Sequence, residues 1–148
     1  MLVEFQQALA DLTASPELCN EARREPAMLR RRYALSEREW QRLVGIVQHP
    51  GMECACIVYR ANRLAPLALN LPQTCRALGP RLRDVASDYW RTYPEGNVHF
   101  YVEADRFCCY LQARLIADDT LPAAVLPALA AEAAAVAAAL IESQTEAA

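Results

Sequence analysis

Lysine is absent from this chain of 148 residues, and glycine is scarce, with only four residues. The scattered glycines cannot build the glycine-rich loop that cradles phosphate groups in nucleotide-binding proteins. All fifteen basic residues are therefore arginines, and the acidic residues outnumber them to leave a net charge of −3. This charge balance gives no general attraction to nucleic acid or to an anionic membrane. The arginine guanidinium groups that are present suit the binding of carboxylates and backbone carbonyls.

No Cys-x-x-Cys pair occurs, and the only histidines are His49 and His99. This excludes zinc ribbons and thioredoxin-like redox motifs, and the spacing predicts no metal site and no nucleophile motif in this chain. On a helix, the thiols of Cys54 and Cys56 would point about 200° apart, so we expect Cys54 in the core and Cys56 on the surface. For the cysteines as a set we expect buried thiols in a reducing cytosol. They are Cys19, Cys54, Cys56, Cys75, Cys108 and Cys109.

A long uninterrupted apolar run is also missing. The chain opens on an amphipathic stretch with Glu4 and Asp11, without the basic and apolar regions of a secretory signal. The alanine-rich tail over residues 123–141 approaches the length of a membrane span, but Pro127 and Glu132 interrupt it and alanine is only weakly apolar. We therefore expect a soluble, cytoplasmic protein whose last helix packs on the rest of the chain.

What the sequence does contain is a series of helix signals, together with 54% hydrophobic residues, which suffices for a core. The clearest signal is the capping box of Ser36 and Glu39, which precedes an apolar helical stripe. Pro72 is expected to open a short helix that Gly79 closes. Pro66 falls inside a longer helical pattern and is expected to kink or break it.

The segment 98–115 fits either a helix or a β-hairpin. β-Branched and aromatic residues favour strands, whereas the lack of glycine or asparagine at the expected turn argues against them. Helix is favoured after Asp105, and residues 98–102 are left open. The predicted fold is therefore mainly α, a compact helical domain over 1–95. Residues 96–148 pack on it as part of one unit, as helices or as a small C-terminal antiparallel β-hairpin followed by a helix (α+β).

Between Ile57 and Leu115 the chain carries several short motifs in a fixed order. Tyr-Arg-x-Asn is followed by Pro-x-Thr, then by Leu-Gly, and finally by Tyr-Pro. The residues concerned are Tyr59, Arg60, Asn62, Pro72, Thr74, Leu78, Gly79, Tyr93 and Pro94. In order and spacing these motifs resemble the small partner proteins of multinuclear-iron TIM-barrel oxidases, the MbnC-like, TglI-like and HvfC-like family.

The resemblance implies a non-catalytic subunit of an iron-dependent oxidase that modifies a cysteine of a ribosomally synthesised peptide. The chain would form a heterodimer with the TIM-barrel subunit, stabilise it and help to recognise the precursor peptide. The iron would lie in the barrel, so no cofactor, no metal ligand and no catalytic residue are expected in this chain. The candidate partner- or peptide-binding residues are Tyr59, Arg60, Asn62, Arg30, Arg31 and Arg32.

Two further expectations concern binding. If strands form between Val98 and Leu115, an exposed edge there could take up the peptide as an added strand. The alternative function is a helical DNA-binding or transcription-associated domain, for which the helix with Trp40 and its neighbouring arginines is the only support. The acidic net charge and the lack of a basic face weigh against that alternative.

Overall fold

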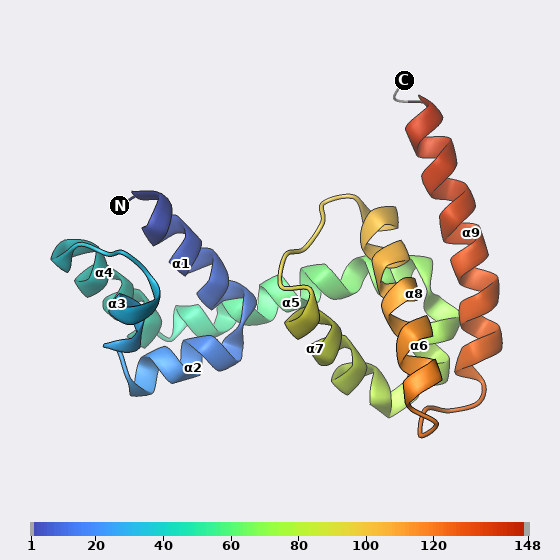
Figure 1. Ribbon diagram of the computed structural model, residues 1–148, viewed down its shortest axis with the longest axis horizontal. Coiled ribbons are helices and arrows are strands. Elements are labelled where there is room, and N and C mark those ends of the chain that lie inside the picture. The colour runs from blue at the N-terminus through green and yellow to red at the C-terminus, as the bar shows by residue number, and fades with distance from the viewer. Residues whose placement is uncertain (1, 147–148) are drawn as a thin grey trace. The chain divides into compact units, whose positions relative to one another are not determined.

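The computed structural model describes residues 2–146, and 83% of the chain is helical (Figure 1). The helices are α1 (Leu2–Ala14), α2 (Pro16–Arg24), α3 (Met28–Arg32), α4 (Glu37–Gln48), α5 (Gly51–Asn70), α6 (Pro72–Leu78), the 3₁₀ turn η1 (Gly79–Arg81), α7 (Leu82–Thr92), α8 (Phe100–Ala117) and α9 (Val125–Glu146). No strand occurs among these residues. The predicted mainly α fold is therefore confirmed; of the two alternatives for the segment 98–115, the helix favoured after Asp105 is present and the β-hairpin is wrong.

The hairpin prediction fails because burial in α8 follows the period of a helix. The buried residues of α8 recur three to four positions apart; they are Glu103, Ala104, Phe107, Cys108 and Leu111. This inner stripe packs in the core beside α9, so tertiary burial outweighs the strand preference of the β-branched and aromatic residues. Without strands in this segment, there is no strand edge that could accept a peptide there.

The chain divides into two units, Met1–Ala61 and Asn62–Ala148, and the division falls inside α5. From the sequence we expect one compact unit, with residues 96–148 packed on residues 1–95. In the structure, α6 and α7 belong to the second unit together with α8 and α9. Each unit has a hydrophobic core of its own, and each is described separately below.

Unit 1 is built from α1–α4 and the first part of α5. Ser15 caps α2 by accepting a hydrogen bond from the backbone N–H of Leu18 at 3.1 Å, with proline at the first helical position. The capping box of Ser36 and Glu39 at the start of α4 is also confirmed. These caps satisfy backbone donors that the helix itself cannot pair. The largest fully buried side chains of this core are Leu12, Leu29 and Leu43.

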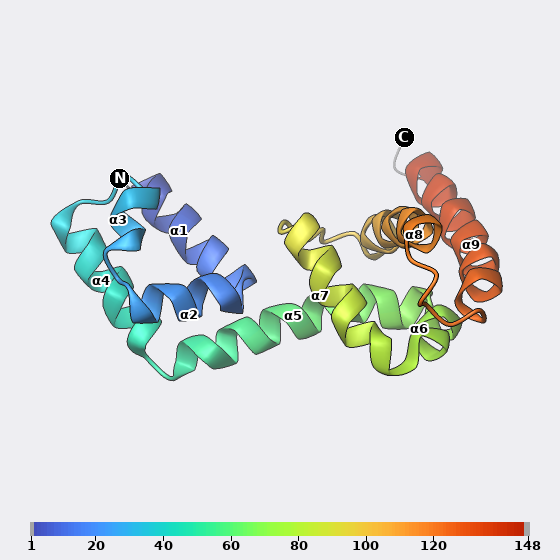
Figure 2. The ribbon, with the colours of Figure 1, turned by 60° about the horizontal axis from the view of Figure 1, so that its bottom comes forward.

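In unit 2, α9 lies beside α8 and α6 (Figures 1 and 2). The N-terminus of α6 lacks a capping side chain of its own, because its cap position is occupied by Leu71. A residue of α9 supplies the cap: the Glu132 carboxylate accepts hydrogen bonds from the backbone N–H groups of Gln73, at 2.7 Å, and Thr74, at 2.8 Å. The core of this unit centres on Tyr89 and Phe107.

The inner face of α5 differs from the predicted one. Cys54 is exposed and Cys56 is buried, the reverse of the prediction. Leu69, an apolar residue of the same helix, is 68% exposed. The helix also continues through Pro66 without a break, so the cost of an interior proline does not end it. An inner face assigned from apolar residues alone misses Arg63, a charged residue that is only 5% exposed.

Candidate functional site

The predicted arginines of α3 are exposed and have partners within unit 1. Arg30 forms an ion pair with Glu37, and its guanidinium carbon lies 4.1 Å from the centre of the Trp40 ring. Arg31 pairs with Glu25 at 2.6 Å. The third arginine of the run, Arg32, lies over the Tyr33 ring at 5.8 Å. Ion pairs as exposed as these contribute about 1 kcal/mol or less to stability, so the three side chains stay available to a binding partner.

Arg60 has a closer partner than the sequence indicates. It pairs with Glu17 of α2 at 3.0 Å, and its side chain is only 22% exposed. Burial alone would raise the pKa of Glu17, but hydrogen bonds from its own backbone N–H and from Arg60, together with the Arg60 charge, lower it below its usual value. Tyr59 is half-buried and Asn62 is exposed. No described contact joins these residues to the arginines of α3.

A buried ion pair in unit 2 was missed by the sequence analysis. Arg63 donates to Glu103 Oε1 from Nε at 3.1 Å and from Nη2 at 2.8 Å, and the Glu103 side chain is 1% exposed. A fully buried charge pair is retained only where further hydrogen bonds satisfy its remaining donors and acceptors. The signal that could have revealed it is the position of Glu103 in the inner stripe of α8, next to Ala104.

The remaining hydrogen bonds of this pair hold the loop of residues 93–99, which we call the anchored loop. Arg63 Nη1 donates to the carbonyl oxygens of Tyr93, at 2.7 Å, and Pro94, at 3.2 Å. Glu103 Oε2 accepts a hydrogen bond from the backbone N–H of Asn97 at 3.1 Å. The loop between α7 and α8 is therefore fixed from inside by one arginine and one glutamate.

The outer side of the anchored loop is held by a second arginine, Arg106. It donates to the carbonyl oxygen of Glu95 at 3.0 Å, and its guanidinium carbon lies 5.7 Å from the centre of the Tyr93 ring. At Gly96, a Cβ atom would lie 3.3 Å from Cδ of Arg63, so a larger residue would crowd the buried guanidinium. The loop thus has an ordered backbone although it contains no regular secondary structure.

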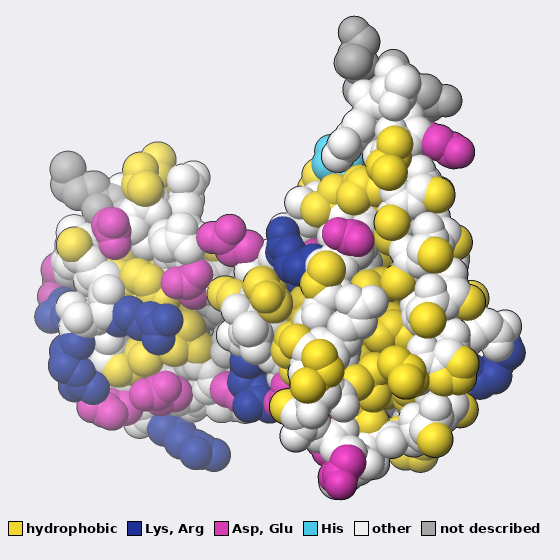
Figure 3. Space-filling model, turned by 45° about the vertical axis from the view of Figure 1, so that its right-hand side comes forward, with side chains coloured by type: hydrophobic (Ala, Val, Ile, Leu, Met, Phe, Trp, Pro, Cys, Tyr) yellow, Lys and Arg dark blue, Asp and Glu magenta, His cyan; other side chains and the backbone are white. Residues whose placement is uncertain are grey.

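The anchored loop and the first turn of α8 carry four exposed apolar side chains, which we call the apolar tip. It consists of Tyr93, 39% exposed, Val98, 89%, Phe100, 44%, and Tyr101, 41%. Figure 3 shows that hydrophobic side chains also gather over α8 and α9. An aromatic group held on an ordered backbone is typical of protein–protein interfaces, in which tyrosine and phenylalanine are enriched.

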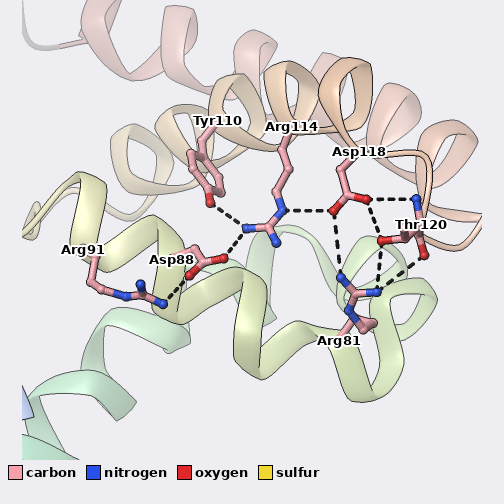
Figure 4. Close-up of polar contacts among 7 residues, drawn as sticks. All are labelled: Arg81, Asp88, Arg91, Tyr110, Arg114, Asp118 and Thr120. Atoms are coloured by element: carbon pink, nitrogen blue, oxygen red, sulfur yellow. Dashed lines mark hydrogen bonds and ion pairs between the residues drawn. The ribbon is translucent and has the colours of Figure 1, made fainter. Parts of the chain in front are cut away.

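A polar network connects α7 with the end of α8 (Figure 4). Arg114 donates to Asp88 at 2.5 Å and to the Tyr110 hydroxyl at 3.0 Å, and the Asp88 hydrogen bond raises the pKa of the arginine. Asp118 lies 3.8 Å from Arg114 Nε, and hydrogen bonds from Thr120 lower its pKa. The other members are Arg81 and Arg91. The acidic and basic side chains of this network pair with one another, so the network links α7 to the end of α8.

The last helix, α9, has the length and composition of a membrane-spanning helix. Residues Val125–Thr145 of α9 have a mean hydropathy of 1.8, and 17% of the most apolar stretch is buried within the protein. One such helix is weak evidence for a membrane protein, because core helices of soluble proteins have the same composition. In this chain α9 buries Val125, Leu129 and Val136 in the core of unit 2.

Among residues 2–146, no three His, Cys, Asp or Glu side chains come together as a group that could hold a metal ion. Comparison with protein-family models, with curated proteins and with solved structures finds no match to this chain.

Proposed function

We propose that this chain is a non-catalytic partner subunit of an iron-dependent oxidase that modifies a cysteine of a ribosomally synthesised peptide. It contributes to recognition of the precursor peptide and stabilises the catalytic TIM-barrel subunit, which holds the iron. The proposal rests on the motif order between Ile57 and Leu115 for the kind of partner. It rests on the apolar tip for the presence of a protein-binding surface.

The apolar tip is the observation that carries the interface. Interfaces depend on a few large side chains that enter pockets of the partner, and binding is tighter when these side chains are already ordered. Phe100 and Tyr101 meet both conditions, because they start α8 directly after a loop that Arg63 and Glu103 hold in place. The same ion pair holds the carbonyl oxygens of the Tyr-Pro motif at residues 93–94.

The first test is coexpression with an iron-binding TIM-barrel oxidase of the kind that the motif order implies. On coexpression, we expect the two proteins to elute as one complex in size-exclusion chromatography. The complex should contain iron and consume oxygen with the precursor peptide. Elution as independent monomers at micromolar concentration would contradict the proposal.

The interface is tested with the double variant Phe100→Ser, Tyr101→Ser. We expect the dissociation constant of the complex to rise at least about 30-fold, which corresponds to about 2 kcal/mol, the loss typical of central interface residues. The matched control is Ile116→Ser, since Ile116 lies in the same helix and is 90% exposed. Equal affinity of both variants, with unchanged circular dichroism, would place the interface elsewhere.

The predicted peptide-binding role of Arg60 is tested in the same complex. Arg60→Ala removes both the guanidinium and its ion pair with Glu17, whereas Glu17→Gln removes only the charge of the partner. If Arg60 contacts the peptide, Arg60→Ala weakens peptide binding and Glu17→Gln does not. An equal effect of the two changes would make Arg60 a structural residue of unit 1. The triple change of Arg30, Arg31 and Arg32 to alanine tests the α3 arginines in the same way.

A further inference from the structure

Two thiols of unit 1 meet at a small hollow that lies outside the surfaces described so far. Cys19 of α2 is 2% exposed and Cys56 of α5 is 3% exposed. Both line a hollow of about 130 Å³, together with residues that include Arg23 and Glu53. A small solute in this hollow would contact residues Cys19 and Cys56, which come from different helices.

The two thiols line the same hollow from different helices. Cys56 Sγ donates to the carbonyl oxygen of Leu12 at 3.4 Å, and burial together with the nearby Cys19 thiol raises the pKa of Cys56. The exposed cysteines differ in this respect. Cys54 lies on the opposite side of α5 from Cys56, and Cys109 belongs to unit 2. Cys19 and Cys56 are thus a pair by geometry, although they stand far apart in the sequence.

We propose that Cys19 and Cys56 are an oxidative modification site, at which a small peroxide joins α2 to α5 by a disulfide bond. In the first step one thiolate attacks the O–O bond of hydrogen peroxide, which yields a sulfenic acid and releases hydroxide. In the second step the other thiol, on losing its proton, attacks the sulfenic sulfur, forms the S–S bond and releases water. Overall, two thiols lose two electrons and two protons, and one peroxide becomes two waters.

The surroundings of the thiols determine how fast this reaction runs. Burial, followed by the Cys19 thiol, raises the pKa of Cys56 to about 11, while Arg23 of α2 and Arg60 of α5 act in the opposite direction. The facing groups also include Glu53 of α5. Because the thiolate is the reactive form, oxidation speeds up as the pH rises toward that pKa. At neutral pH little thiolate is present, so the disulfide forms slowly and needs prolonged exposure to peroxide.

The cross-link would enclose residues 20–55, a segment that contains α3, α4 and the predicted arginines Arg30, Arg31 and Arg32. Joining its ends restricts the unfolded chain, so the disulfide stabilises unit 1. This inference does not depend on the proposed function, because it concerns two thiols of unit 1, whereas the apolar tip belongs to unit 2.

The test uses the full chain carrying Cys54→Ser and Cys109→Ser, which removes both exposed thiols. The change at Cys54 is needed because tryptic cleavage after arginine leaves Cys54 and Cys56 together in the peptide 43–60, while Cys19 falls in the peptide 1–23. After treatment with hydrogen peroxide at mildly alkaline pH and alkylation of the remaining thiols, we expect these two peptides to be linked. The intact chain should be lighter by two hydrogen atoms before alkylation, and its thermal midpoint should rise.

Two controls make the result decisive. Cys75→Ser, which removes a half-buried thiol of unit 2, should leave the link intact, while Cys19→Ser and Cys56→Ser should each abolish it. The same peroxide treatment in urea should give a lower yield, because the unfolded chain no longer holds the two thiols together. Full alkylation of both cysteines after peroxide treatment of the folded chain would overturn the proposal. An equal yield in urea, or links to other cysteines in place of this one, would also overturn it.

Discussion

At the scale of single residues, the most consequential side chain is Arg63. It is buried, it pairs with Glu103, and its third donor group holds two carbonyl oxygens of the anchored loop. Its guanidinium carbon also lies 5.5 Å from the centre of the Tyr89 ring, so the charge rests against an aromatic face. An arginine on the solvent-facing side of the same helix would make none of these three contacts.

Replacing Arg63 with alanine leaves the Glu103 carboxylate buried without a counter-charge. Breaking a buried pair from one side typically costs about 3–5 kcal/mol, and we expect a loss of that size in the free energy of unfolding measured with urea. Arg31→Ala is the matched control, since its ion pair is exposed and should contribute at most about 1 kcal/mol.

Hydrogen exchange of the anchored loop is a second measurement on the Arg63→Ala variant. Hydrogen exchange of residues 93–99 should become faster in Arg63→Ala even where unit 2 remains folded, because the loop loses the two side-chain hydrogen bonds that hold its carbonyl oxygens in place. If hydrogen exchange of the anchored loop and the free energy of unfolding are both unchanged in this variant, Arg63 does not hold the loop in place.

At the scale of elements, the contact between α9 and α6 is the most specific one in unit 2. The alanine-rich helix offers few large side chains, so its position depends on a small apolar stripe and on the Glu132 cap. A carboxylate at a helix N-terminus also interacts favourably with the partial positive charge there. The cap therefore fixes where along α9 the short helix α6 is bound.

Changing Glu132 to alanine removes this cap. We expect unit 2 to lose about 1 kcal/mol of stability, the usual effect of deleting a capping side chain, measured by thermal or urea unfolding. Glu142→Ala is the control, because Glu142 lies in the same helix and is exposed. A loss of the same size in the control would show that the effect comes from helix composition and not from the cap.

At the scale of the whole molecule, the chain has two cores that share one helix, α5. Leu43 is fully buried in the first core and Phe107 in the second. Truncating a buried leucine or phenylalanine to alanine typically costs about 2–5 kcal/mol. Because the cores are separate, we expect each change to act mainly on its own unit.

Hydrogen exchange followed by mass spectrometry tests this expectation. In Leu43→Ala, exchange should become faster in α1–α4, and in Phe107→Ala it should become faster in α6–α9, with α5 responding to both. Faster exchange throughout the chain in both variants would mean that the two units unfold as one cooperative domain.

The sequence by itself determined most of the helices and their ends. The serine caps at Ser15 and Ser36, and the proline start and glycine end of α6, are short-range hydrogen-bonding and steric effects that operate within a few residues. Adjacent residues of a helix cannot both face the core, and of the neighbours Cys108 and Cys109 the structure buries Cys108 and exposes Cys109. The candidate binding residues of the Tyr-Arg-x-Asn motif and of α3 are likewise read from the sequence and stay predictions.

Only the tertiary structure decided which faces are buried and which charges are paired. Apolar residues indicate the wrong inner face of α5, because Arg63 is buried by a partner forty residues away. Residues 100–115 form a helix because their core contacts repeat with a helical period, which local strand preference cannot reveal. The anchored loop, the Glu132 cap and the Cys19–Cys56 pair all join residues distant in sequence, and such contacts exist only once the helices have packed.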